Sequence, residues 1–157
     1  MTEKNIKQVK EFLEARGINV TILNFKETTR TSELAAKAIG CEVSQIAKSL
    51  VFIPDRTSAV LVIASGKSRV DTRKLAEKLG ASEARIADAK TVKETTGFPI
   101  GGVPPVAHNK SLRTFIDARL MSYPVVYAAA GTPNAILGIS SEDLKKVTGA
   151  EVADVFE

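Results

Sequence analysis

IAKSLVFIPDRTSAVLVIA, residues 46–64, is the stretch that decides the fold of this sequence. It holds two mostly apolar runs, at 46–53 and 59–64, separated by Pro54, Asp55 and further polar residues. Two short apolar runs joined by turn-forming residues are typical of a β-hairpin. The sequence therefore predicts a strand pair near its centre.

Helices and further strands are predicted on both sides of this hairpin. An apolar period of 3.6 residues predicts an N-terminal helix that ends at Gly17. Residues able to cap a helix N-terminus predict four more helices, begun by Thr31 or Ser32, Asp71, Asp88, and Ser140 or Ser141. Further strands are predicted at 18–25, 112–116, 125–129, 136–139 and 152–156. The elements do not alternate strictly, so we expect a mixed α/β (α+β) fold with one domain over residues 1–157.

Composition narrows the class of protein. The 157 residues are 44% hydrophobic and 25% charged, which is ordinary for a globular domain. No apolar run reaches the roughly 18 residues of a membrane span, and the N-terminus does not resemble a secretory signal, so we expect a cytoplasmic protein. A single cysteine, Cys41, and a single histidine, His108, exclude most Cys- and His-based metal sites. A carboxylate-only magnesium site stays open; no cofactor is predicted.

The net charge of +4 is compatible with an RNA or nucleotide partner, although many basic proteins bind no nucleic acid. Catalytic motifs with fixed spacing are absent: the sequence has no GxxxxGK[ST] phosphate loop and no G-x-S-x-G nucleophile elbow. Two features remain as candidates for chemistry, namely Lys48 and a glycine- and proline-rich loop.

Lys48 interrupts the first strand of the predicted hairpin. The two-residue period of a strand places it on one face with Ile46, Leu50 and Phe52. Burying an unpaired ammonium is unfavourable, so the position needs an explanation. Either the aliphatic stem carries the charge to water near the strand end, or the ammonium binds an anion or a carbonyl in a pocket.

The loop Gly97-Phe98-Pro99-Ile100-Gly101-Gly102-Val103-Pro104-Pro105 is the most unusual stretch of the chain. Consecutive glycines allow positive φ and close backbone approach, and the prolines after them stiffen the chain. Such a loop can direct N–H groups at an oxyanion, or it can be only a tight connection. His108 lies three residues beyond it and is predicted either to bind substrate or to have a structural or surface role.

Four segments occur in an order that resembles the YbaK / prolyl-tRNA-synthetase-associated editing domain family. They are IAKSLVF at 46–52, TGFPIGGVPP at 96–105, AAGTP at 129–133 and ISSEDL at 139–144. The resemblance implies a central, partly closed mixed sheet surrounded by helices. It also implies hydrolysis of the ester that links a wrong, small amino acid to tRNA-Pro, by a free-standing, trans-editing domain.

The resemblance further assigns residues. Lys48 matches the functional lysine of the family, and Gly101 and Pro105 match the ends of its glycine-x-x-x-proline loop. We expect catalysis to involve Lys48, Gly101 and Gly102, with no metal. Predicted substrate-binding residues are Thr31, Pro105, His108, Ala129, Gly131 and Ile136. The cysteine-specific branch has a serine and an aspartate where this chain has Ala129 and Ile136, which favours alanine or another small neutral residue as much as cysteine.

Thr31 has a second interpretation, because residues 26–31 are equally well explained as a helix-capping loop. Two alternatives to the enzyme also stay open: a non-catalytic RNA- or nucleotide-binding module of the same fold, and a partner of prolyl-tRNA synthetase that delivers tRNA without hydrolysing it. Mischarged aminoacyl-tRNA is the predicted partner of the enzyme, with prolyl-tRNA synthetase as a second one, and no membrane is expected.

Overall fold

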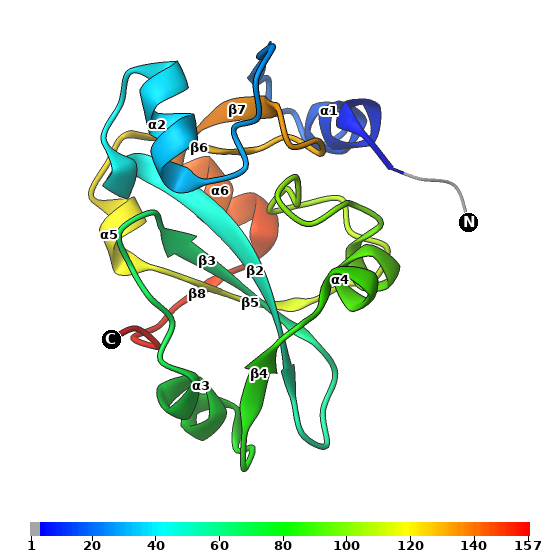
Figure 1. Ribbon diagram of the computed structural model, residues 1–157, viewed down its shortest axis with the longest axis vertical. Helices are drawn as coiled ribbons and strands as arrows, with labels where there is room; N and C mark the ends of the chain where they lie inside the picture. Colours follow the sequence, from blue (N-terminus) through cyan, green and yellow to red (C-terminus); the bar gives the residue numbers. More distant parts are fainter. Residues whose placement is uncertain (1–3) are drawn as a thin grey trace.

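The computed structural model describes residues 4–157, which form one mixed sheet with helices on both faces (Figure 1). The helices are α1 (Ile6–Glu14), α2 (Ser32–Ile39), α3 (Thr72–Leu79), α4 (Ala89–Thr96), α5 (Ala118–Met121) and α6 (Ser141–Thr148), with a 3-10 turn, η1 (Val43–Gln45). The strands are β1 (Thr21–Asn24), β2 (Ile46–Pro54), β3 (Val60–Ser65), β4 (Ala84–Ile86), β5 (Arg113–Ile116), β6 (Val125–Ala129), β7 (Ala135–Ser140) and β8 (Glu151–Val152).

The sheet has the strand order β1-β7-β6-β2-β3-β5-β8, and β4 pairs with β2 off this path. β2 runs parallel to β6 and antiparallel to β3 and β4, so the sheet is mixed as predicted. The predicted hairpin is confirmed by the β2–β3 register, in which Lys48 lies opposite Ala64. The sheet is open, with β1 and β8 as its two end strands, so the partial closure that the resemblance implies is not found in residues 4–157.

Helix starts follow the predicted caps, whereas the N-terminal helix α1 ends at Glu14 and not at the predicted Gly17. The Thr31, Asp88 and Ser140 side chains each accept a hydrogen bond from a backbone N–H of the first turn that comes after them, in α2, α4 and α6. Asp71 does the same for α3. These bonds satisfy N–H groups that have no partner inside the helix, which is why the chain enters each helix at that residue.

Two predicted strands differ from the structure. The first is confined to β1, Thr21–Asn24, instead of residues 18–25. The last, predicted at 152–156, is wrong: β8 covers Glu151–Val152, and Phe156 forms only an isolated bridge with Val70. Val155 and Phe156 are buried in the core, so their apolar character reflects packing and not strand pairing.

Three groups of buried side chains hold the sheet and helices together. The largest lies on one face of the sheet and takes Val9 and Leu13 from α1, Val92 from α4 and Leu144 from α6. On the other face, α3 packs over Phe52 and Phe115, and α2 packs over Ile46 and Ile136. Figure 1 shows α2 and α3 at opposite ends of the long strand β2. No helix of residues 4–157 therefore covers the middle of β2 on this face.

Candidate functional site

A notch in the sheet forms the centre of the site. The ladder between β2 and β6 ends at the pair Ala47–Ala128, and the ladder between β2 and β4 begins at the pair Phe52–Ile86. Both strands lie along the same edge of β2. Within the described part of the chain, residues 48–51 of β2 therefore have no strand beside them on that edge, although β3 pairs with them on the other edge.

A cavity of about 460 Å³ opens over this notch. Its walls come from β2, from the start of α2 with the segment that precedes it, from the end of the β6–β7 pair, and from the 97–105 loop. A volume in this range is ordinary for a small-molecule site. Thr31, Lys48, Gly101, Ala129 and Ile136 all line it, so the fold brings five of the predicted site residues together.

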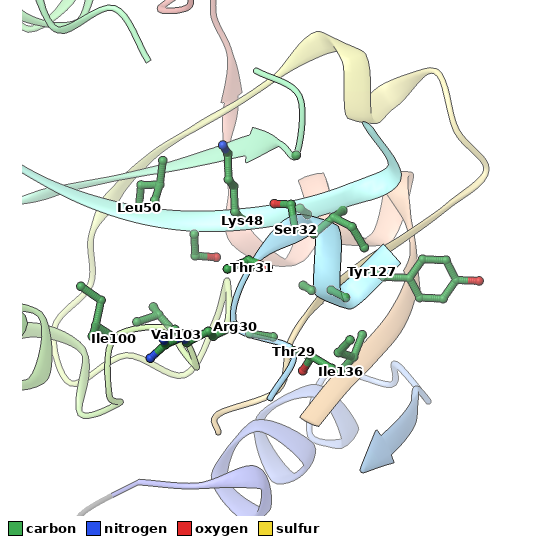
Figure 2. Close-up of a pocket in the computed structure, with 18 of the residues that line it drawn as sticks. Thr29, Arg30, Thr31, Ser32, Lys48, Leu50, Ile100, Val103, Tyr127 and Ile136 are labelled. Atoms are coloured by element: carbon green, nitrogen blue, oxygen red, sulfur yellow. The ribbon is translucent and has the colours of Figure 1, made fainter. Parts of the chain in front are cut away.

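Lys48 is half-buried in the wall of this cavity, on the same side of β2 as Leu50 (Figure 2). Burial lowers the pKa of its ammonium, the nearby carboxylates of Glu33 and Asp117 oppose this effect, and the Arg69 guanidinium adds to it. Within residues 4–157 no hydrogen bond or ion pair reaches its Nζ atom. A partly desolvated cation without a partner is well suited to bind an anionic or carbonyl oxygen of a ligand.

The glycine- and proline-rich loop contributes Ile100 and Val103 to the cavity wall, and Figure 2 shows these two side chains on the other side of β2 from the Lys48 ammonium. The N–H of Gly102 donates to the Pro99 carbonyl at 3.0 Å, which closes a turn. Gly101 has a φ of 86°, a conformation that favours glycine, and its Cα faces Arg30 so closely that an added Cβ would lie 2.9 Å from the Arg30 Cβ. Gly101 lines the cavity, whereas Gly102 does not.

Thr31 is placed for both of the roles that the sequence left open. Its side chain caps α2, and the residue lines the cavity. The segment before it is fixed to the β6–β7 turn, because the Pro133 carbonyl accepts hydrogen bonds from the Thr29 N–H and from the Thr28 and Thr29 hydroxyls. These bonds hold one rim of the cavity in place.

Apolar side chains line much of the cavity under α2. Ala129 and Ile136 are paired across β6 and β7, and Ala35 of α2 lies over this region. Tyr127 also contributes to the wall, but Figure 2 shows its ring pointing away from the other side chains. Among the described residues, Glu33 is the one acidic residue of the cavity wall.

Four predicted site residues lie outside the cavity wall: Gly102, Pro105, His108 and Gly131. Gly102 packs on the Thr132 backbone, and Gly131 packs on Asn5 and Phe98. Nε2 of His108 lies 2.7 Å from the Pro104 carbonyl oxygen, and burial, with Lys4 nearby, lowers the pKa of this imidazole. His108 thus contacts the loop but does not line the cavity. Roles for these four residues in substrate binding stay predictions.

Most residues of the wall were not predicted as site residues, and among them are Glu33, Ser49, Ile86 and Ile100. Ile86 and Ile100 are large apolar side chains that are 60% and 55% exposed. Glu33 resembles any acidic residue in the first turn of a helix. Nothing in the sequence marks Ser49 as a site residue, because it lies at the cavity only as a result of where the β4 and β6 ladders end.

Neither a metal centre nor a membrane span is found in the part of the chain that the structure describes. No group of three or more His, Cys, Asp or Glu side chains in residues 4–157 is placed to hold a metal ion. No helix formed by these residues is long and apolar enough to cross a bilayer.

Comparison with known proteins identifies the family. The model of the aminoacyl-tRNA editing domain matches residues 26–147, and the chain belongs to this family. A crystal structure described as that of a candidate trans-editing enzyme for prolyl-tRNA synthetase superposes with a TM-score of 0.91 at 42% identity, over 100% of this chain and 99% of that one.

Curated relatives agree with this assignment. The uncharacterised protein YwhH of Bacillus subtilis is 30% identical over 83% of both chains. EbsC of Enterococcus faecalis, named as a candidate Cys-tRNA(Pro)/Cys-tRNA(Cys) deacylase, is 24% identical over 83% of this chain and 80% of its own length. A proline–tRNA ligase of Desulforamulus reducens is 31% identical over 83% of this chain, which is 22% of the ligase.

Proposed function

We propose that this protein is an aminoacyl-tRNA deacylase that removes a small, wrong amino acid from tRNA-Pro in trans. The observation that carries the proposal is that one cavity is lined both by Gly101 and by Lys48, whose half-buried ammonium has no partner among residues 4–157. Family membership and the candidate trans-editing enzyme of the same fold support it.

The reaction requires little protein chemistry, because an aminoacyl ester is already activated. Water attacks the ester carbonyl, the bond from the acyl carbon to the ribose oxygen breaks, and the products are the free amino acid and the tRNA hydroxyl. The attacking water gives up a proton, and the neighbouring ribose hydroxyl assists its transfer to the departing oxygen. No residue of the chain forms a covalent intermediate in this scheme.

Two groups of the cavity stabilise the charge of this reaction. The Gly101 N–H donates to the carbonyl oxygen as it becomes an oxyanion, and Lys48 binds the terminal phosphate or orients the aminoacyl end. A preorganised donor of this kind contributes about 10²–10³ in rate. The Gly102 N–H is already used in the turn to Pro99, so we assign the loop's donor role to Gly101.

The apolar end of the cavity favours a small, neutral amino acid. Ala35, Ala129 and Ile136 line this end of the cavity and offer no polar group to a substrate side chain. We therefore propose alanine as the preferred residue, with cysteine as a competitor that has nearly the same size. One methylene changes the binding free energy of an amino acid by only about 1–3 kcal/mol, so a synthetase benefits from a second site that selects its products by size. Prolyl-tRNA synthetase, which produces the mischarged tRNA, is the proposed partner.

A deacylation panel at low salt tests the proposal. tRNA-Pro charged with Ala, Cys, Ser or Pro, together with Ala-, Ser- and Thr-tRNA of their own kinds, is offered to the wild type and to Lys48→Ala. Lys37→Ala, at an exposed position of α2 outside the cavity wall, is the control because it removes the same charge. We expect rapid loss of Ala-tRNA-Pro that Lys48→Ala slows by about 10²–10³ and Lys37→Ala leaves unchanged. Binding of tRNA without hydrolysis of any species would contradict the enzyme and favour a non-catalytic module.

A further inference from the structure

Three backbone groups of β2 lack a partner at the notch. The Ala87 N–H donates to the Val51 carbonyl, so Val51 directs its backbone polar groups toward the edge where β4 and β6 lie. Alternate residues of a strand face the same edge, so the N–H and C=O of Ser49 face it too. With the β6 ladder ending at Ala47 and the β4 ladder beginning at Phe52, the Ser49 N–H, the Ser49 C=O and the Val51 N–H have no hydrogen-bond partner from residues 4–157.

The side chain of Ser49 also lacks a hydrogen-bond partner. Its Oγ atom is buried, and it is the one side-chain polar atom of the described residues that is buried without a hydrogen bond. Buried polar groups are almost always paired, because each unpaired one is destabilising by roughly 1–3 kcal/mol. Three backbone groups without a partner from residues 4–157, next to a buried hydroxyl that also lacks one, therefore mark a place in the cavity wall where the main chain is free to bind a polar ligand.

An α-aminoacyl ester carries the groups that fit this edge. Its ammonium is a donor, its carbonyl is an acceptor, and a single carbon joins them, as in a residue of a strand. A strand edge that offers one C=O flanked by two N–H groups pairs with such a residue as it would with a neighbouring strand. The cavity wall at this point includes both Ser49 and Val51.

We propose that the notch binds the aminoacyl group of the substrate by main-chain hydrogen bonds. The Ser49 carbonyl accepts a hydrogen bond from the α-ammonium, and one of the two flanking N–H groups, of Ser49 or of Val51, donates to the ester carbonyl. This inference rests on the proposed function and adds to it a requirement for a free α-amino group. Main-chain groups do not distinguish between side chains, so selection by size is left to Ala129 and Ile136.

Glu33 is the competing site for the ammonium, because it provides the one carboxylate that the described residues place in the cavity wall. Its charge already acts on Lys48, whose pKa it raises against the effect of burial. Glu33 is also exposed, whereas Ser49 is not, so its attraction for a cation is screened by water. The variant Glu33→Gln separates the two sites.

The first test uses the amino group of the substrate. Ala-tRNA-Pro and N-acetyl-Ala-tRNA-Pro are compared with the wild type and with Glu33→Gln. We expect acetylation to lower kcat/KM by roughly 10–100-fold, the range for a hydrogen bond to a charged group, and Glu33→Gln to keep this preference. Equal hydrolysis of both substrates, or loss of the preference in Glu33→Gln, would overturn the inference and leave the deacylase intact. Hydrolysis of neither substrate would instead contradict the proposed function.

The second test does not depend on turnover. Adenosine carrying alanine through a 3′-amide, which is not hydrolysed, is titrated into ¹⁵N-labelled protein while backbone amide resonances are followed. We expect the amide proton of Ser49 or Val51 to move downfield, and that of Leu50, which faces β3 from the same strand, to move little. Shifts confined to α2 and the 97–105 loop, with none at Ser49 or Val51, would show that the notch does not hold the aminoacyl group.

Discussion

Gly102 allows the 97–105 loop to pack directly on the backbone of Thr132. A Cβ added at Gly102 would lie 2.7 Å from the carbonyl carbon of Thr132 and 2.8 Å from its Cα. Both are backbone atoms, so no side-chain rotation relieves the contact. The substitution Gly102→Ala must therefore push the loop away from the β6–β7 turn, and Gly101 at the cavity moves with it.

The size of the effect can be worked out from this contact. Extra volume in a well-packed site is destabilising by about 1–3 kcal/mol, which for a domain of this length is roughly 2–12 °C in melting temperature. A misplacement of about 1 Å at a catalytic group lowers the rate by about 10²-fold. We expect Gly102→Ala to show both losses, in thermal unfolding and in kcat/KM for Ala-tRNA-Pro.

Gly149→Ala is the matched control. Gly149 ends α6 with a φ of 65°, and an added Cβ there would meet no atom within 4 Å. This variant carries only the strain of the left-handed conformation, about 1–2 kcal/mol, far from the cavity. It should lose stability and keep activity. A Gly102→Ala protein with the melting temperature and the kcat/KM of the wild type would refute the argument that this contact positions the loop.

Three further variants test residues of the cavity wall, and a fourth tests His108 beside the loop. Lys48→Met keeps the apolar stem and removes a desolvated charge, so the melting temperature should not fall while kcat/KM drops by about 10²–10³; a clear loss of stability would show that the ammonium has a structural role. Ser49→Ala removes a buried hydroxyl that has no partner among residues 4–157, so the free energy of unfolding should stay within about 0.5 kcal/mol of the wild type or rise, and a larger decrease in urea unfolding would argue against the unpaired state. Ile136→Ala should lower stability by about 2–5 kcal/mol and let the cavity accept larger residues such as valine; unchanged selectivity would remove Ile136 from the size filter. The pKa of His108 is lowered in the folded state, so as the pH falls the unfolded chain takes up the proton first. The free energy of unfolding should therefore decrease below pH 6.5, the ordinary pKa of histidine, by at most about 1.4 kcal/mol per pH unit. This decrease should be absent in His108→Gln when unfolding is compared at pH 7.5 and 5.5.

Local features of the fold could be predicted because their causes are local. Thr31, Asp71, Asp88 and Ser140 cap helices through their own side chains, and the 46–64 hairpin results from two apolar runs and a turn. β4 could not be predicted in this way. Its three residues, Ala84–Ile86, carry no alternation that distinguishes them from a loop, and they are a strand only because the end of β2 lies beside them.

Prediction of the notch fails for the same physical reason, although other parts of the site could be predicted. Lys48 and Gly101 could be found because an isolated charge on an apolar face and a glycine-rich loop are visible in the sequence. The notch is instead a property of three strands: β6 stops pairing after Ala47, β4 starts pairing at Phe52, and the gap between them has a length that no single segment encodes. Ser49, an ordinary serine in a strand, becomes unusual only through this gap. If main-chain recognition at the notch is correct, substituting Ser49 by another small residue preserves binding, so the amino-acid identity at this position carries little information about its role.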